Sequence, residues 1–97
     1  MDQALELLGR RWALGIVWEL RRERLGFGQI QKRLGVSPSV LSERLAELVE
    51  AGVCEVEEEG RRYCLTGRGR ELARVLFELN RWANSDSDRA TGSILEK

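Results

Sequence analysis

The chain has 97 residues, of which 42% are hydrophobic, with two cysteines, no histidine and a formal net charge of zero. This length allows one small domain that buries only a modest share of its surface, so a partner subunit could contribute to its core. Without histidine, the chain lacks the usual general base at neutral pH and the commonest metal ligand. Two cysteines alone form neither a zinc site nor a disulfide framework, so we expect no metal, no cofactor and no enzymatic activity.

The sequence also carries no signal for membrane insertion or secretion. Its longest apolar run, residues 12–18, is far shorter than the roughly 20 residues of a membrane-spanning helix. The first residues, MDQALEL, lack the basic start of a signal peptide. We therefore expect a soluble, cytoplasmic protein.

The zero net charge hides an uneven distribution. Residues 1–34 carry seven lysines and arginines against four acids, and residues 60–82 carry six against two. Between them, residues 35–59 carry one arginine against seven glutamates. Two basic blocks therefore flank an acidic one, and a nucleic-acid partner is compatible with the local charges although the average charge argues against it.

Apolar spacing predicts three helices in the first third of the chain. Segments 4–12 and 12–20 each repeat apolar residues at helical intervals, with a break near Gly9. A third, short helix is expected after Gly26, and Gly35 suits the left-handed position just past its end.

A fourth helix has the clearest start signal in the chain. Ser37 can cap its free backbone N–H groups, Pro38 fits the first helical position, and Gly52 suits its end. Its apolar stripe is Leu41, Leu45, Leu48 and Val49. The opposite stripe is Ser39, Ser42, Glu43 and Ala46.

After this helix the apolar period changes from 3.6 to 2, which predicts a β-hairpin with its tip near Gly60. A two-residue turn there would set Cys54 opposite Leu65 and Val56 opposite Tyr63. The two cysteines would then point to opposite faces of the hairpin, so we expect no disulfide between them.

Thr66 can cap a last helix whose apolar arc is too broad for a single neighbour. That arc consists of Leu72, Val75, Leu76, Leu79 and Trp82, widened by Ala73 and Phe77. After Ala83 the sequence is polar and aperiodic, so we expect one domain over residues 1–83 and a disordered tail over 84–97.

The order of these elements predicts the fold class. Three helices, a glycine turn, a fourth helix and a hairpin make a mainly α protein with a small β-hairpin wing, which is a winged helix-turn-helix. A helix that packs by one stripe on such a core leaves its opposite stripe free for the major groove of DNA.

Four segments resemble the HxlR-type transcriptional regulators, which are related to the MarR group. They are LELLGRRWALGIVWEL, FGQIQKRLGVSPSVLSERLAELVEAGV, YCLTGRGRELARVL and the late Trp82, and their most specific part runs from Ser37 to Leu45. The resemblance implies a sequence-specific DNA-binding regulator, expected to be a repressor, that acts as a homodimer on a pseudo-palindromic operator. Its expected partners are double-stranded DNA, a second copy of the chain and a small-molecule effector of unknown identity.

Candidate site residues follow from these roles. Ser39, Ser42 and Glu43 would face base edges, and the basic residues would neutralise phosphates. The candidate DNA-binding residues are Arg11, Lys32, Arg33, Ser37, Ser39, Ser42, Glu43, Arg44, Arg61 and Arg62. The candidate dimer-interface residues, on the first and last helices, are Leu5, Leu8, Leu72, Leu76, Leu79 and Trp82.

Two sets of basic residues have an alternative assignment. Arg44 could instead form a surface pair with Glu47 or Glu19. The wing arginines 61 and 62 could be cross-strand partners of the glutamates at 57 and 58. Together with the zero net charge, this acidic wing leaves a second function open, namely a winged-helix protein-protein interaction module that has lost DNA binding.

The cysteines depart from the family pattern. Many members carry a sensor cysteine shortly before the first helix, and aligning Trp12 places that position ahead of Met1, so we do not expect this route of thiol sensing from residues 1–97. Cys54 is expected to be a small buried residue. Cys64, on the outer face of the hairpin, is the alternative candidate for a redox role.

Overall fold

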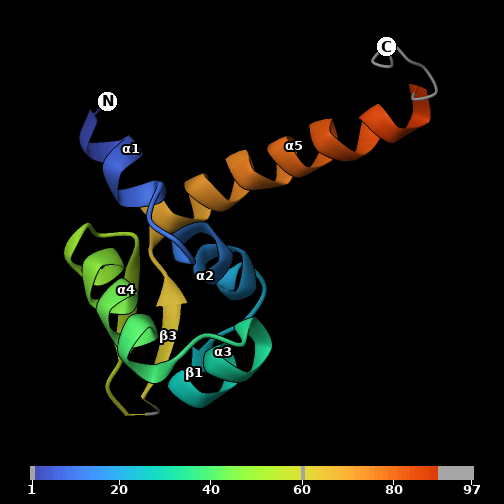
Figure 1. Cartoon of the computed structure of the whole chain (residues 1–97). Coiled ribbons are helices and arrows are strands. Elements are labelled where there is room, and N and C mark those ends of the chain that lie inside the picture. The colour runs from blue at the N-terminus through green and yellow to red at the C-terminus, as the bar shows by residue number, and fades with distance from the viewer. Residues whose placement is uncertain (1, 60, 90–97) are drawn as a thin grey trace.

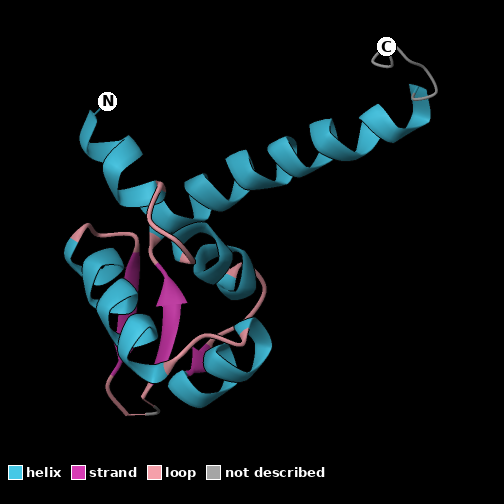
Figure 2. Cartoon of the chain, viewed as in Figure 1, coloured by secondary structure: helices cyan, strands magenta, loops and turns pink. Residues whose placement is uncertain are grey.

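The computed structural model describes residues 2–59 and 61–89, which form five helices and three short strands. The helices are α1 (Asp2–Leu8), α2 (Ala13–Leu20), α3 (Phe27–Leu34), α4 (Pro38–Glu50) and α5 (Gly67–Arg89). The strands are β1 (Leu25–Gly26), β2 (Cys54–Glu57) and β3 (Arg62–Leu65). A rounded body holds the sheet with α2, α3 and α4, and α5 projects from it as a long arm (Figure 1). Figure 2 shows that helices predominate, which confirms the mainly α fold class with a small wing.

The first two helices are separated at the predicted break. The N–H of Gly9 donates to the carbonyl oxygen of Leu5 at 2.8 Å, and the chain then turns. Trp12 ends this turn with a φ of 78°, a left-handed conformation that a bulky residue rarely adopts. α2 follows directly, and its residues Ile16 and Val17 are completely buried at the centre of the body.

The turn between α3 and α4 uses the expected residues. Gly35 has a φ of 68° and donates its N–H to the carbonyl oxygen of Gln31 at 2.8 Å. The hydroxyl oxygen of Ser37 then accepts from the N–H of Val40 at 3.4 Å, which caps α4. These contacts fix the direction in which α4 leaves the turn.

α4 ends in a Schellman motif at the predicted glycine. Gly52 has a φ of 78°, and its N–H donates to the carbonyl oxygen of Val49 at 3.0 Å. The next N–H, of Val53, donates to the carbonyl oxygen of Leu48 at 2.9 Å. This motif satisfies the last carbonyl groups of the helix and leads the chain straight into β2.

The three strands form an antiparallel sheet in the order β1-β3-β2. The predicted hairpin register is confirmed, because Cys54 pairs with Leu65 and Val56 pairs with Tyr63. β1 was not predicted, since a two-residue strand is too short to show an apolar period. Leu25 of β1 pairs with Tyr63 and extends the sheet beside α3.

One hydrophobic core joins the body. It takes the inner stripe of α4, the centre of α2 and the inward side chains of the sheet. The buried residues that pack together in this core are Ile16, Val17, Leu20, Leu25, Ile30, Val36, Leu41, Leu45, Leu48, Val53, Cys54, Leu65, Ala73 and Leu76. Leu41, Leu45 and Leu48 confirm the predicted inner stripe of α4, whereas Val49 is 37% exposed at its margin.

Thr66 anchors the start of α5, as predicted. Its hydroxyl oxygen accepts from the N–H of Gly69 at 3.0 Å and lies 2.6 Å from the carbonyl oxygen of Gly52. The Thr66 N–H donates to the carbonyl oxygen of Val53 at 3.0 Å. The cap therefore joins α5 to the turn that follows α4.

α5 is longer than expected. A tail was predicted from Asn84 onward, but the helix continues to Arg89, and residues 90–97 lie outside the described part of the chain. The segment from Asn84 to Arg89 contains no proline or glycine, so nothing in it breaks a helix that is already nucleated. None of the described helices is both long and apolar enough to cross a membrane.

Candidate nucleic-acid interface

α4 divides its residues between the core and the outer surface. Its three inner leucines are buried, and the opposite stripe of Ser39, Ser42, Glu43 and Ala46 is exposed. The Glu43 side chain is 67% exposed. The neighbouring side chains, Ser39, Ser42 and Ala46, are small, so a partner molecule could approach the backbone of α4 closely.

The amino-terminal end of α4 also faces outward. Ser37 and Ser39 are exposed beside the first backbone N–H groups of the helix. These groups carry the positive end of the helix dipole, which favours an anion such as phosphate. Both serines are therefore exposed at an end of α4 that favours an anion, and their contact with DNA stays a prediction.

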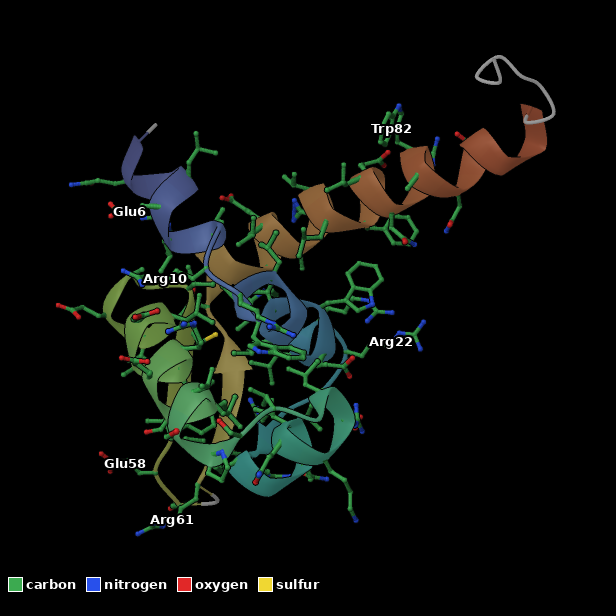
Figure 3. The ribbon with its side chains drawn as sticks, in the orientation of Figure 1. Glu6, Arg10, Arg22, Glu58, Arg61 and Trp82 are labelled. Carbon is green, nitrogen blue, oxygen red and sulfur yellow. The ribbon has the colours of Figure 1, made fainter. Side chains whose placement is uncertain are left out.

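The wing carries one free arginine and one paired arginine. Arg61, with a φ of 52°, is exposed at the tip, where it and Glu58 point away from the body (Figure 3). Arg62 instead lies 3.6 Å from the carboxylate of Glu57, which also lies 3.8 Å from Arg24. The alternative assignment is therefore confirmed for Arg62, which pairs across the strands with Glu57. Arg61 has no ion pair with any residue in 2–59 or 61–89.

Lys32 and Arg33, adjacent on α3, have different environments. Arg33 is held by Glu23 at 2.9 Å and by Glu19 at 3.5 Å, and the hydrogen bond to Glu23 raises the pKa of its guanidinium. Lys32 is exposed and makes no ion pair with a described residue. Lys32 is therefore available to a phosphate, and Arg33 is engaged in a contact between α3 and the end of α2.

Arg44, a predicted DNA contact, packs back against its own chain. Its side chain is only 14% exposed, and its Nε donates to the carbonyl oxygen of Arg11 at 3.0 Å. Its terminal nitrogen lies 3.4 Å from Glu43 and 3.5 Å from Glu47. The alternative pairing with Glu47 is thus present, while Glu19, the other alternative, is paired with Arg33.

Arg11 remains exposed, with its guanidinium 5.1 Å from the centre of the Trp12 ring. This stacking orients the side chain but leaves its N–H groups accessible. Arg11 therefore keeps its place among the candidate phosphate contacts. Its backbone carbonyl, in contrast, is occupied by Arg44.

The candidate dimer residues fall into two groups. Leu5, Leu79 and Trp82 are strongly exposed, with Trp82 at 71%. Leu76 is only 8% exposed, because it packs into the core of its own chain, and Leu72 and Leu8 are half-buried. The core takes only the first turns of α5, and Figure 3 shows Trp82 on the part of the arm that extends beyond the body.

Two further apolar residues of α5 are exposed, and Val75 lies on the stripe of Leu79 and Trp82 whereas Phe77 lies on the opposite side of the helix. Val75 is 61% and Phe77 is 52% exposed, and neither was assigned to an interface. The spacing of three and four residues in the sequence places Val75 on the same apolar arc as Leu79 and Trp82, without assigning it to the interface. The broad apolar arc of α5 was predicted, but Val75 and Phe77 were left out of the candidate interface.

The two cysteines lie on opposite faces of the hairpin and are both free, as predicted. Cys54 is 2% exposed, and burial raises its pKa to about 12. Cys64 is half-buried, and its thiol lies 3.9 Å from the carboxylate of Glu55. No group of three or more potential metal ligands occurs among the described residues.

The model of the HxlR-like helix-turn-helix family matches residues 7–91. The chain belongs to the HxlR-like helix-turn-helix family. Rv3095 of Mycobacterium tuberculosis, named an uncharacterized HTH-type transcriptional regulator, is 36% identical to this HxlR-like chain over 95% of its length. The chain spans only 61% of that relative. YvaP of Bacillus subtilis, named in the same way, is 38% identical over 84% of the chain and 82% of YvaP.

A solved structure supports the same relationship. Quinone-bound YodB of Bacillus subtilis matches this HxlR-like chain with a TM-score of 0.79 and 32% identity, over 88% of the chain and 94% of YodB. The family assignment confirms the resemblance found in the sequence. The relatives are named as transcriptional regulators, in agreement with the expectation that the chain is not an enzyme.

Proposed function

We propose that the chain is a transcriptional regulator that binds DNA through α4, with the outer stripe of this helix in the major groove. The observation that supports this most strongly is the division of α4 into a buried leucine stripe and an exposed stripe of serines around Glu43. The major groove is wide enough to admit a helix of this kind. Lys32, Arg11 and Arg61 are the accessible basic side chains proposed to contact phosphates.

Glu43 is the proposed base-reading residue. A carboxylate in the major groove can accept a hydrogen bond from the amino group of cytosine, and a good base contact discriminates by about 1–3 kcal/mol. The carboxylate would otherwise repel phosphates, so a groove position explains its place on this surface better than a backbone position does.

We also propose that two copies form the DNA-binding unit. The exposed apolar side chains of Leu5 on α1 and of Val75, Leu79 and Trp82 along the α5 arm support this, because exposed apolar patches are typical of an interface. Two copies related by a twofold axis would place their α4 helices about 34–36 Å apart, one helical turn of DNA. The operator would then be pseudo-palindromic, and binding over a promoter would repress transcription.

The experiment is a selection from a randomised duplex pool, followed by fluorescence anisotropy on the enriched duplex and a scrambled duplex at increasing salt. We expect two inverted half-sites, and an affinity that falls with salt by a logarithmic slope of about 0.9 per neutralised phosphate. Lys32→Ala should lower that slope, whereas Arg81→Ala, which removes the same charge from the α5 arm, should not. No enrichment, or an affinity indifferent to salt, would contradict DNA binding.

The second candidate function is the interaction module that has lost DNA binding. The acidic wing and the pairing of Arg62 with Glu57 favour it, because they remove positive charge from the surface that should face DNA. This candidate predicts no binding to any duplex even at low salt. The anisotropy experiment therefore distinguishes the two functions.

For the small-molecule effector we propose the groove between α1 and α5, whose volume is about 230 Å³. YodB was solved with a bound quinone, so duroquinone, which has no free ring position for thiol addition, is a suitable probe. It should lower the affinity for the enriched duplex, and unchanged affinity up to its solubility limit would contradict the proposal. The lining is mainly apolar and consists of Ala4, Leu7, Leu8, Val53, Leu72 and Val75, together with the charged Arg68 and Glu71.

A further inference from the structure

A network of charged side chains joins α4 to the junction between α1 and α2. Arg44 is its centre, with its Nε on the carbonyl oxygen of Arg11 and a terminal nitrogen between Glu43 and Glu47. Glu47 extends the network, because its other carboxylate oxygen lies 3.7 Å from the Nε of Arg10. Figure 3 shows Arg10 between α1 and α4.

The contacts of Arg44 compete with binding to phosphate. A guanidinium has its donors in a fixed plane, and here the Nε–H and one terminal nitrogen already have acceptors within the chain. A phosphate that approached Arg44 would also meet the negative charges of Glu43 and Glu47. A phosphate could reach the remaining terminal nitrogen without displacing these contacts, but the Arg44 side chain is only 14% exposed.

The acceptor on the α1–α2 junction is itself in a special position. The carbonyl of Arg11 precedes Trp12, whose φ of 78° persists only where the surroundings hold it. Arg44 supplies one such contact from a residue 33 positions away. The same hydrogen bond therefore links α4 to the turn between α1 and α2.

We propose that Arg44 is a positioning residue that holds α4, and with it the Glu43 carboxylate, in the orientation needed to read DNA, and that it makes no contact with DNA itself. The inference rests on the proposed function, namely that α4 binds in the major groove. It assigns the specificity of α4 partly to a side chain that faces the protein. Glu47 has the same role, because its carboxylate contacts both Arg44 on α4 and Arg10 in the α1–α2 junction.

The decisive variant is Arg44→Lys. Lysine keeps the charge but lacks the planar fork and the Nε–H that reaches the Arg11 carbonyl. If Arg44 contacted a phosphate, lysine would replace it, and affinity, salt slope and base preference would stay near those of the wild type. If Arg44 positions α4, lysine should keep the salt slope and lose the base preference that Glu43 provides, a loss of about 5- to 150-fold in discrimination.

Arg44→Ala and Glu47→Gln provide independent measurements. Each should lower the ratio of affinities for the enriched and the scrambled duplex, and neither should lower the salt slope by the value of about 0.9 expected for a lost phosphate contact. Glu50→Gln is the matched control, since Glu50 is exposed on α4 and makes no ion pair with a described residue. It should leave the ratio unchanged.

The wild-type chain is measured first, by anisotropy on the enriched and scrambled duplexes, with circular dichroism on every variant to check that it folds. Failure of the wild type to bind any duplex rejects the proposed function. If the wild type binds, a wild-type base preference in Arg44→Lys, or a slope lowered by about 0.9 in Arg44→Ala, overturns the positioning role alone. If Arg44→Ala fails to fold, Arg44→Lys and Glu47→Gln decide between the two outcomes.

Discussion

Gly69 packs its Cα against the carbonyl oxygen of Val53 so closely that a Cβ atom on Gly69 would overlap with that oxygen. The same Cβ would lie 3.1 Å from a methyl carbon of Leu65. This close approach lets the first turn of α5 cross the start of β2, where Thr66 caps the helix. The direction of the α5 arm therefore depends on the absence of a side chain at one position.

Gly69→Ala should destabilise the fold by about 1–3 kcal/mol, because backbone and core atoms must shift to admit the methyl group. This loss should exceed the gain of about 1 kcal/mol that alanine brings to a helix. Urea unfolding followed by circular dichroism measures the difference.

Gly67→Ala is the matched control in the same helix. A Cβ at Gly67 would meet only a side-chain atom of Arg70, at 3.8 Å, which is an ordinary contact. This variant should be as stable as the wild type or more stable by up to about 1 kcal/mol. Equal stability of the two variants would show that the close approach at Gly69 has no energetic consequence.

The sequence predicted the elements whose signals are local. Ser37, Gly35 and Gly52 act on neighbouring backbone groups, and the alternation around Cys54 determined the strand register. The contact of Gly69 with Val53 could not be predicted in this way, because it depends on how two elements cross in space. No local pattern reports such a crossing.

The site was predicted less completely than the fold, for a related reason. A long side chain such as that of Arg44 can extend outward or fold back, and the choice depends on the carbonyl of Arg11, 33 residues away. The burial of Leu76 depends equally on how α5 crosses α2. Glu43 and Lys32 lie on the outward faces of their helices, and the prediction that both are on the surface is confirmed.

Cys64 should react with iodoacetamide in the native state at pH 8, and Cys54 should not. Burial raises the pKa of Cys54 to about 12, so its thiol stays protonated and shielded at this pH. Mass spectrometry of peptides from native and urea-unfolded protein measures both sites. Alkylation of Cys54 at the same rate in both states would contradict its placement in the core.

The same shift predicts how stability depends on pH. The folded state holds the Cys54 proton up to about pH 12, whereas the unfolded state releases it near the ordinary pKa of 9.0. The unfolded state therefore binds fewer protons between these values, and stability should fall as pH rises through that range. A Cys54→Ala variant should lack this component in urea unfolding at pH 9 to 11, and an identical pH dependence in both proteins would contradict it.

Trp82→Ala should weaken self-association without unfolding the body. Trp82 is 71% exposed on the arm, and a central aromatic residue often contributes 2 kcal/mol or more to an interface, about 30-fold in dissociation constant. Analytical ultracentrifugation over a concentration series measures the change. Val56→Ala, at another exposed apolar residue on the wing, is the control and should associate as the wild type does.

Leu76→Ala should show the opposite behaviour to Trp82→Ala. Leu76 is buried in its own chain, so its truncation should cost about 2–5 kcal/mol of folding stability. The two variants together separate the core face of α5 from its exposed face. A monomeric wild type at all concentrations, or a Trp82→Ala variant that dimerises normally, would contradict the proposed interface.

The most direct test of DNA reading by α4 is a parallel selection from a randomised duplex pool with the wild type and Glu43→Gln. Glu50→Gln, which loses the same charge at the end of the same helix, is the control. We predict that Glu43→Gln changes the preferred base at one position in each half-site and that Glu50→Gln selects the wild-type sequence. Identical selected sequences for all three proteins, or a uniform change in affinity for every sequence with Glu43→Gln, would contradict base reading by this face of α4.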